Sequence, residues 1–218
     1  MAEKQWSFLF DLNGTVIDDM HFHIQSWYEI LNGLGATISY EETKLQCYGK
    51  NEELLERVFP GRFKPEEIEQ MIIEKETRYQ ENFRPHLKLI EGLGDFLETA
   101  YRKGIKMAIG SAAIPFNINY VLDGLQLHQY FPVVVSAYDV VESKPHPETF
   151  LQCAEKLQVA PGDCIVFEDS PKGVEAAARA GMKAVVITTM HTKEEFTNDN
   201  IICFIENYHD GQLKQLLN

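Results

Sequence analysis

The chain has 218 residues and a formal net charge of −13 at pH 7, and its length suits one domain or a core with a small insertion. Because no cluster of Lys and Arg interrupts the negative charge, nucleic acid and anionic membrane surfaces are poor partners. No apolar run approaches a membrane span, and the charged start of the chain does not resemble a signal peptide. The four cysteines form no CxxC pair, which favours reduced structural thiols in a cytoplasmic protein.

Short runs rich in β-branched and aromatic residues recur along the chain and predict strands. The first run ends in Asp11, and each run is nearly continuous in apolar character, as expected for strands buried on both faces. Cys164 and Cys203 lie in strand-like apolar stretches. The predicted strands occupy residues 6–11, 105–110, 132–137, 163–169 and 183–189.

Helical segments lie between the later strands. In the clearest, SPKGVEAAARAG, Ser170 is the expected N-cap, Pro171 the first helical residue and Gly181 the stop. Strand followed by helix, repeated along the chain, predicts an α/β fold with a parallel sheet and helices on its faces.

Residues 17–83 break this alternation and carry no strand signal. Apolar residues recur there at helical spacing, most clearly over 24–34 and 68–79. We therefore expect an all-helical insertion at 17–83 within a core made of residues 1–16 and 84–218. Because two linkers that meet at one strand end form a hinge, the insertion is expected to act as a lid over the chemistry.

Several residues of the insertion have structural interpretations. Asp18 and Asp19 are expected to begin its first helix, where negative charge suits the helix dipole. Asn51 is the expected N-cap of a shorter helix. Trp27, Tyr28, Met71 and Tyr79 follow the apolar spacing and are expected in the insertion's own small core.

Polar residues follow the predicted strands at their carboxyl ends, where ligands of parallel α/β sheets bind. Two or three carboxylates suit Mg²⁺, and a lysine, a hydroxyl and nearby amides could donate to a phosphoryl group. A carboxylate in line with phosphorus is a competent nucleophile, so Asp11 is expected to form an aspartyl-phosphate. The residues at this edge are Asp11, Ser111, Lys144, Glu168 and Asp169. Ser111 is also expected to cap the helix that follows it.

The segments FDLNGT, GSAA, SKPHPETF and FEDSPKGVEAA resemble, in order and spacing, the four motifs of the haloacid dehalogenase superfamily of phosphohydrolases. The sequence looks most similar to the β-phosphoglucomutase-like branch, and DDMHFHIQSW resembles the start of that branch's helical cap. The resemblance implies a Rossmann-like core, an obligatory Mg²⁺ and a small phosphorylated substrate. The implied activity is that of a phosphatase or a sugar phosphomutase.

The same resemblance implies roles for individual residues. Asp11 would be the nucleophile, and the backbone carbonyl of Asn13 would join the carboxylates as a metal ligand. Two residues of the predicted cap, His23 and Lys50, are further candidates for substrate contact. The other implied residues are Ser111, Ala112 and Lys144 for the phosphate, and Asp11, Glu168 and Asp169 for the metal.

Asn13 is the motif position where the chain departs from the family pattern, because the family's phosphotransferases carry an acid/base aspartate there. An amide can hold a hydrogen bond but cannot exchange a proton near pH 7. Since general acid/base help is worth about 10²–10⁴ in rate, we expect slow turnover, a bias toward good leaving groups and a long-lived phosphorylated Asp11. Three explanations stay open: an engineered change, a native residue with His21 or His23 carrying the proton, or deamidation at Asn13–Gly14.

Two other functions are open from sequence. A catalytically weak or inactive binder of phosphorylated ligands would keep the fold, the metal and the cap. Metal-free dehalogenation also uses an aspartate nucleophile, but it has no use for the Glu168–Asp169 pair. Because a mutase depends most on the acid/base, the sequence favours a phosphatase, and a cap that must swing favours a monomer.

Overall fold

The computed structural model describes residues 5–217, which divide into two units. The core unit contains the described residues up to Asp18 and from Lys88 onward, and the helical unit is Asp19–Leu87. Each unit is built from a different kind of sequence pattern, continuous apolar runs in the first and helical spacing in the second. Across the described residues, no helix is both long and apolar enough to cross a bilayer.

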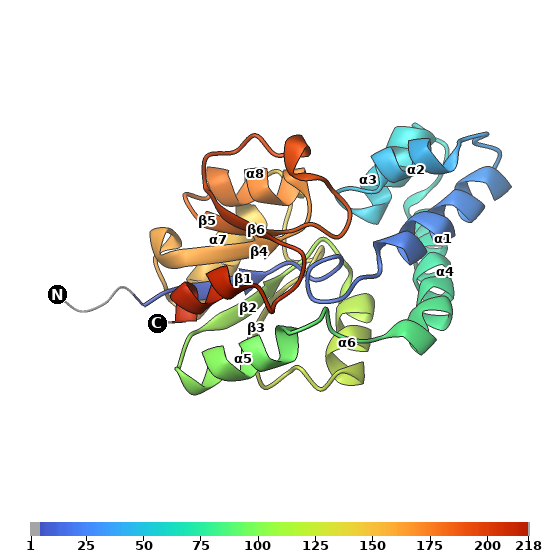
Figure 1. Cartoon of the computed structure of the whole chain (residues 1–218). Coiled ribbons are helices and arrows are strands. Elements are labelled where there is room, and N and C mark those ends of the chain that lie inside the picture. Colours follow the sequence, from blue (N-terminus) through green and yellow to red (C-terminus); the bar gives the residue numbers. More distant parts are fainter. Residues whose placement is uncertain (1–4, 218) are drawn as a thin grey trace. The chain divides into compact units, whose positions relative to one another are not determined.

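The core unit is built on a six-stranded parallel sheet (Figure 1). Its strand order is β3-β2-β1-β4-β5-β6, so β1 lies between β2 and β4 near the middle. The prediction of a parallel α/β sheet is confirmed, and β6 adds an edge strand to the predicted five. The strands are β1 Ser7–Phe10, β2 Met107–Gly110, β3 Val133–Val135, β4 Cys164–Glu168, β5 Lys183–Ile187 and β6 Ile201–Ile205.

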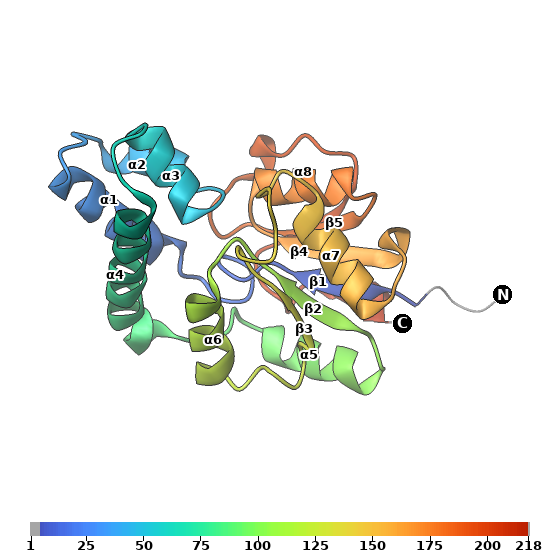
Figure 2. The same ribbon diagram turned by 180° about the vertical axis from the view of Figure 1, so that it is seen from behind.

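Helices cover both faces of this sheet, which gives the predicted Rossmann-like arrangement. Side chains alternate along a strand, so Leu9 joins the buried cluster under two of the helices while Phe8 stacks on Phe96 of another. Figures 1 and 2 show α7 and α8 on one side of the sheet and α5 on the other. The core helices are α5 Leu93–Arg102, α6 Pro115–Gly124, α7 Glu148–Leu157 and α8 Pro171–Arg179.

The helix signals of the core are confirmed at α8 and wrong before α6. The Ser170 hydroxyl accepts from the Gly173 amide at 3.1 Å, Pro171 is the first helical residue, and Gly181 follows the end with φ +73°. Ser111 does not cap a helix, because α6 begins later, after Ile114. The Ser111 hydroxyl instead accepts from the amide of the second residue along, at 3.1 Å.

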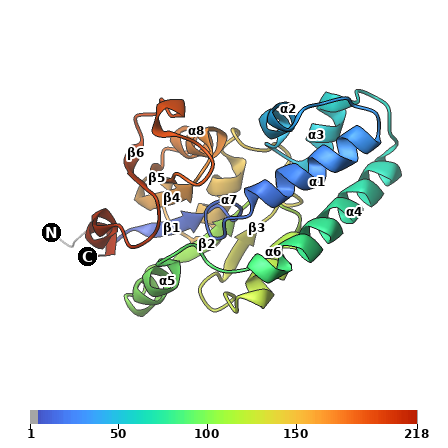
Figure 3. The same ribbon diagram turned by 45° about the vertical axis from the view of Figure 1, so that its right-hand side comes forward.

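The helical unit consists of four α-helices, with α1 and α4 lying side by side (Figure 3). As predicted, no strand occurs among its residues, all of which are described. Trp27 and Tyr79 are 2% and 0% exposed, which confirms them as core residues of this unit. Tyr28 and Met71, expected in the same core, are only half-buried. The helices are α1 Met20–Gly33, α2 Tyr40–Gln46, α3 Asn51–Val58 and α4 Pro65–Phe83. Short 3₁₀ helices occur in the chain at Arg84–His86, Pro161–Asp163, Lys193–Glu195 and Gly211–Leu217.

Of the two predicted helix starts in this unit, the one at Asp19 is confirmed, since α1 begins directly after it, and the predicted cap of α3 is wrong in detail. Lys50, not Asn51, occupies the N-cap of α3. The side-chain Nδ2 of Asn51 donates to Glu76 Oε1 on α4 at 2.9 Å. Asp19 occupies the N-cap of α1 without a side-chain capping bond. Its carboxylate accepts from the Tyr79 hydroxyl at 2.5 Å, whereas at Asn51 a tertiary partner has taken the side chain from its expected capping role.

Candidate active site

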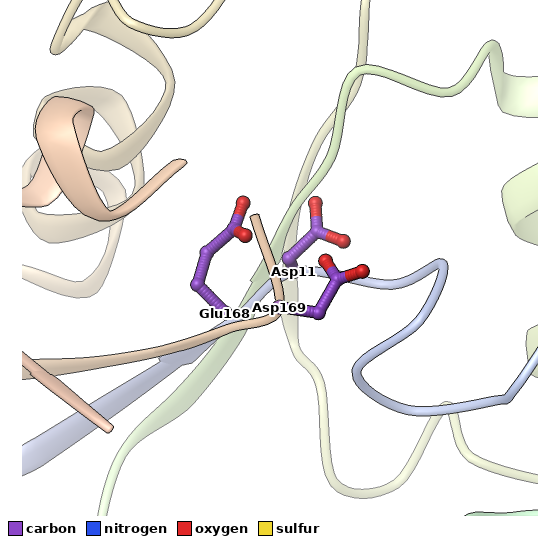
Figure 4. A group of neighbouring side chains, drawn as sticks. All are labelled: Asp11, Glu168 and Asp169. Carbon is purple, nitrogen blue, oxygen red and sulfur yellow. The ribbon is translucent and has the colours of Figure 1, made fainter. Parts of the chain in front are cut away.

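Three carboxylates meet at the carboxyl end of the central strands. Asp11 follows β1, while Glu168 ends β4 and Asp169 comes next in the chain. Because β1 and β4 pair with Phe10 beside Phe167, the residues that follow are brought side by side. One oxygen of each carboxylate lies within 4.8 Å of the others, and all three side chains are buried. Figure 4 shows the three carboxylates pointing toward a common space.

Lys144 joins this group from the loop after β3. Its ammonium donates to Asp11 Oδ1 at 2.5 Å and to Glu168 Oε1 at 2.8 Å, and it lies 4.6 Å from the centroid of the Phe150 ring. Burial alone would lower its pKa, but the carboxylates of Asp11 and Glu168 outweigh burial and raise the pKa of Lys144 above its ordinary value. Lys144 is therefore a fixed positive charge at neutral pH.

Glu168 is held on both of its oxygens. While Oε1 accepts from Lys144, Oε2 accepts from the Ser170 amide at 2.7 Å and from the Ser170 hydroxyl at 2.9 Å. The first turn of α8 also makes room for this carboxylate, because a Cβ on Gly173 would lie 1.7 Å from Glu168 Oε1. The side chain is thus locked in place, and any larger residue at Gly173 would displace it.

Asp169 lies against the turn that follows β1. Gly14 has φ +75°, and a Cβ there would come 2.1 Å from Asp169 Oδ2, so both backbone and space require glycine. Burial, together with the negative charges of Glu168 and Asp11, raises the pKa of Asp169 well above its ordinary value. Three carboxylates against one lysine leave excess negative charge, and an all-oxygen set of this kind fits a divalent cation.

The remaining predicted residues of the core lie at the same sheet edge. Ser111 follows β2, the other neighbour of β1; its amide donates to Val135 of β3 at 2.9 Å and its side chain is buried. Ala112, next in the chain, is half-buried. Asn13 is half-buried in the turn after β1 and pairs with Ile17 in an isolated bridge. The edge therefore combines acids, an ammonium, a hydroxyl and backbone amides.

His23 and Lys50 belong to the helical unit. His23 is buried, with Nε2 3.2 Å from Asp19 Oδ2 and Nδ1 2.5 Å from Lys75 Nζ. Lys50 is half-buried, and its amide donates to the Glu53 carboxylate at 3.0 Å. Their contact with substrate stays a prediction.

Sequence reasoning missed most of the cluster to which His23 belongs. Lys75 and Glu76 are 1% and 2% exposed, and Lys75 Nζ lies 3.0 Å from Glu76 Oε1. The Tyr79 ring stacks on His23, with centroids 3.8 Å apart. The residue spacing could have revealed this cluster. Lys75 and Tyr79 lie four residues apart on one helix, and Asp19 and His23 lie four residues apart at the start of another, so each pair shares a helix face.

Comparison with known proteins matches the chain to the haloacid dehalogenase-like hydrolase family over residues 8–187. A protein of Haemophilus influenzae is 33% identical over 83% of this chain and 90% of its own length. A fructose-1-phosphate phosphatase of Escherichia coli is 29% identical over 85% of this chain and 97% of its own. The crystal structure of β-phosphoglucomutase from Clostridium difficile matches with a TM-score of 0.84 at 25% identity, covering 98% of this chain and 96% of that one.

Proposed function

Because the chain belongs to the haloacid dehalogenase-like hydrolase family, we propose that it is a Mg²⁺-dependent phosphatase that acts on a small phosphorylated sugar through a phosphate carried on Asp11. The observation that carries the proposal is the buried Lys144 ammonium between Asp11 and Glu168, at 2.5 and 2.8 Å, beside Asp169. The similarity to a fructose-1-phosphate phosphatase supports a sugar phosphate as the substrate class.

The proposed reaction has two steps on one carboxylate. An oxygen of Asp11 attacks phosphorus, the bond from phosphorus to the sugar oxygen breaks, and the leaving oxygen takes a proton. Water then attacks the aspartyl-phosphate and releases inorganic phosphate. Lys144 orients Asp11 and offsets charge at the site, while the Ser111 hydroxyl and the Ala112 amide are the proposed donors to the phosphoryl oxygens.

The proposed metal ligands are Asp11, Asp169 and the backbone carbonyl of Asn13. Glu168 holds Lys144 and Ser170 with its two oxygens, so it would act on a cation chiefly through its charge. When held by these residues, Mg²⁺ would supply positive charge that offsets the negative charge of the phosphoryl group. The excess of carboxylates over ammonium groups at this edge is what favours such an ion.

The helical unit is the proposed cap, with His23 and Lys50 as candidate contacts to the sugar part of the substrate. Both ring nitrogens of His23 already have partners within the unit. This arrangement favours a role for His23 in holding neighbouring side chains over a role as a mobile proton carrier. Lys50 precedes α3 as its N-cap residue. A charged group there would suit a second anionic or polar group of the substrate.

The proposed function is tested by restoring an acid/base residue at position 13. Phosphate release and first-turnover release of the leaving group should be measured with Mg²⁺ for the protein and its Asn13→Asp variant on nitrophenyl phosphate and several hexose phosphates. Because a sugar alkoxide needs a proton to leave and a nitrophenolate does not, the variant should gain about 10²–10⁴-fold in first-turnover release of the sugar and much less in first-turnover release of nitrophenol. Phosphate release, which also needs a base for the attacking water, should rise on both substrates. No release by either protein, with or without Mg²⁺, would contradict the proposal.

A second candidate is a non-catalytic binder of phosphorylated ligands, and the amide at position 13 is the observation that favours it. Such a protein would bind inorganic phosphate or a hexose phosphate in a Mg²⁺-dependent way. Neither the chain nor Asn13→Asp would turn these compounds over. Calorimetric binding alongside the release assay separates the two candidates.

A further inference from the structure

The turn after β1, residues 12–17 (the active-site turn), connects Asp11 to the start of the helical unit and contains Asn13. It is closed by its own backbone: the Gly14 amide donates to the Ile17 carbonyl at 2.8 Å, and the Val16 amide donates to the Leu12 carbonyl at 2.8 Å. Leu12, Val16 and Ile17 are each 0% exposed. The active-site turn is therefore an ordered, buried part of the core unit.

Two hydroxyl groups from distant parts of the chain bind carbonyls of this turn. The Thr189 hydroxyl, just after β5, donates to the Gly14 carbonyl at 2.7 Å, across 175 residues of sequence. The Tyr208 hydroxyl, just after β6, donates to the Thr15 carbonyl at 3.0 Å, across 193 residues. Both carbonyls are thus satisfied by side chains that lie beyond the last two strands, not by the local backbone.

Tyr208 is itself firmly placed. Its ring lies among three aromatic rings of the sheet face, with centroids 6.5 Å from Phe10, 5.7 Å from Phe96 and 5.9 Å from Phe167. Its amide donates to the Glu91 carbonyl at 2.9 Å, and only 5% of the residue is exposed. The hydroxyl is therefore a fixed donor, anchored on the residues that directly precede Asp11 and Glu168 in the chain.

The hydroxyl also keeps its proton. Burial, with the negative charges of Asp11 and Asp169, raises the pKa of Tyr208 well above its ordinary value. A buried phenol that donates to a backbone carbonyl fixes the direction of that peptide. Asp169 lies close to Gly14 of the same turn. The active-site turn is therefore constrained on one side by the Asp169 carboxylate and on another by the segment after β6.

We propose that Tyr208 is a positioning residue: its hydroxyl holds the active-site turn so that the side chain at position 13 keeps its place beside Asp11. This inference rests on the proposed phosphatase function, and it adds a residue from the last segment of the chain to the site. Because a misplacement of about 1 Å can cost on the order of 10²-fold in rate, loss of the hydroxyl should slow turnover rather than weaken substrate binding.

The test is Tyr208→Phe, made in the Asn13→Asp background where position 13 can transfer a proton. In single-turnover measurements the rate of sugar release from a hexose phosphate should fall on the order of 10–100-fold with substrate affinity nearly unchanged. The rate of nitrophenol release from nitrophenyl phosphate should fall only about 2–3-fold, because that leaving group needs no proton. Tyr130→Phe is the control: it removes the hydroxyl of a half-buried tyrosine of the core unit, which donates to Glu98 at 3.0 Å. An equal loss on both substrates would overturn the inference.

Hydrogen exchange tests the same contact without any activity. In Tyr208→Phe, deuterium uptake by a peptide spanning residues 12–17 should rise, and in Tyr130→Phe it should not. Unchanged uptake in Tyr208→Phe would overturn the inference whatever the rates are. If uptake rises while no variant hydrolyses any phosphate, the proposed function fails and the hold of Tyr208 on the turn is supported.

Discussion

The core unit and the helical unit each bury a group of charged side chains, and the two groups differ in how their charges are balanced. The core cluster is Asp11, Lys144, Glu168 and Asp169, with three carboxylates against one ammonium. The pKa of Asp169 is raised there by burial and by its acidic neighbours. The raised pKa is a consequence of this imbalance, because the one ammonium of Lys144 does not offset the charge of three neighbouring carboxylates.

The helical cluster is Asp19, His23, Lys75, Glu76 and Tyr79, which form one connected network. Lys75 reaches both His23 and Glu76, and Asp19 accepts from Tyr79. Although burial works against it, the charges of Lys75 and His23 hold the pKa of Glu76 below its ordinary value. One oxygen, Glu76 Oε2, has no hydrogen-bond partner among the described residues, and it lies 3.9 Å from His23 Nδ1.

The contrast separates two uses of buried charge. Where carboxylates are crowded so that one of them resists ionisation, the fold maintains an unfavourable arrangement, which is typical of sites that bind a cation or do chemistry. Where each carboxylate has a cationic or hydroxyl partner, the network links helices and specifies their packing. This contrast supports the proposal that the chemistry belongs to the core cluster, and it indicates that the helical cluster, apart from the proposed substrate contact of His23, mainly supports the packing of its unit.

The largest stability effect is expected from breaking the helical cluster at Lys75. Lys75→Met leaves Glu76 buried without its cation, so the free energy of unfolding should fall by about 3–5 kcal/mol. Chemical denaturation measures this. Arg78→Met on the same helix is the control, because Arg78 pairs with Glu74 on the surface at 2.9 Å and should cost under about 0.5 kcal/mol. Equal costs would mean that the helical cluster is not a structural network.

Mg²⁺ should distinguish the two clusters next. Because the core cluster has excess carboxylates, Mg²⁺ at about a hundredfold above its Kd should stabilise the fold by about 2.7 kcal/mol. Hydrogen exchange should slow in residues 164–173 and not in 72–79. Asp169→Asn should abolish the effect. Stabilisation that survives this substitution would place the cation elsewhere.

A smaller effect concerns pH and the Glu76 carboxylate. Since its pKa is lowered by folding, its stabilising contribution is present above the ordinary glutamate pKa and is lost as pH falls through the lowered value. Glu76→Gln should therefore cost on the order of 1 kcal/mol near neutral pH, and the gap between the two proteins should shrink below about pH 4. A gap that widens in acid would contradict the assigned charge state.

The sequence patterns predicted most strands and helices of the core unit, but few of its contacts between distant side chains. Because parallel strands end at one edge, acids after two strand-like runs were enough to expect Asp11 and Glu168 together. Nothing local links Tyr208 to Thr15, which meet only through the packing of the last segment on the sheet. Local rules also failed at Asn51, whose side chain binds Glu76 on α4 and does not fill its expected capping role.

The most direct test of the central claim is to look for phosphate on Asp11. The protein would be incubated with Mg²⁺ and nitrophenyl phosphate, quenched in acid and digested for mass spectrometry. Because Asn13 removes the base that would help water attack the intermediate, we expect one phosphoryl group on the peptide that contains Asp11, and none in Asp11→Asn. Release of nitrophenol with an unmodified Asp11 and phosphate on another residue would contradict it.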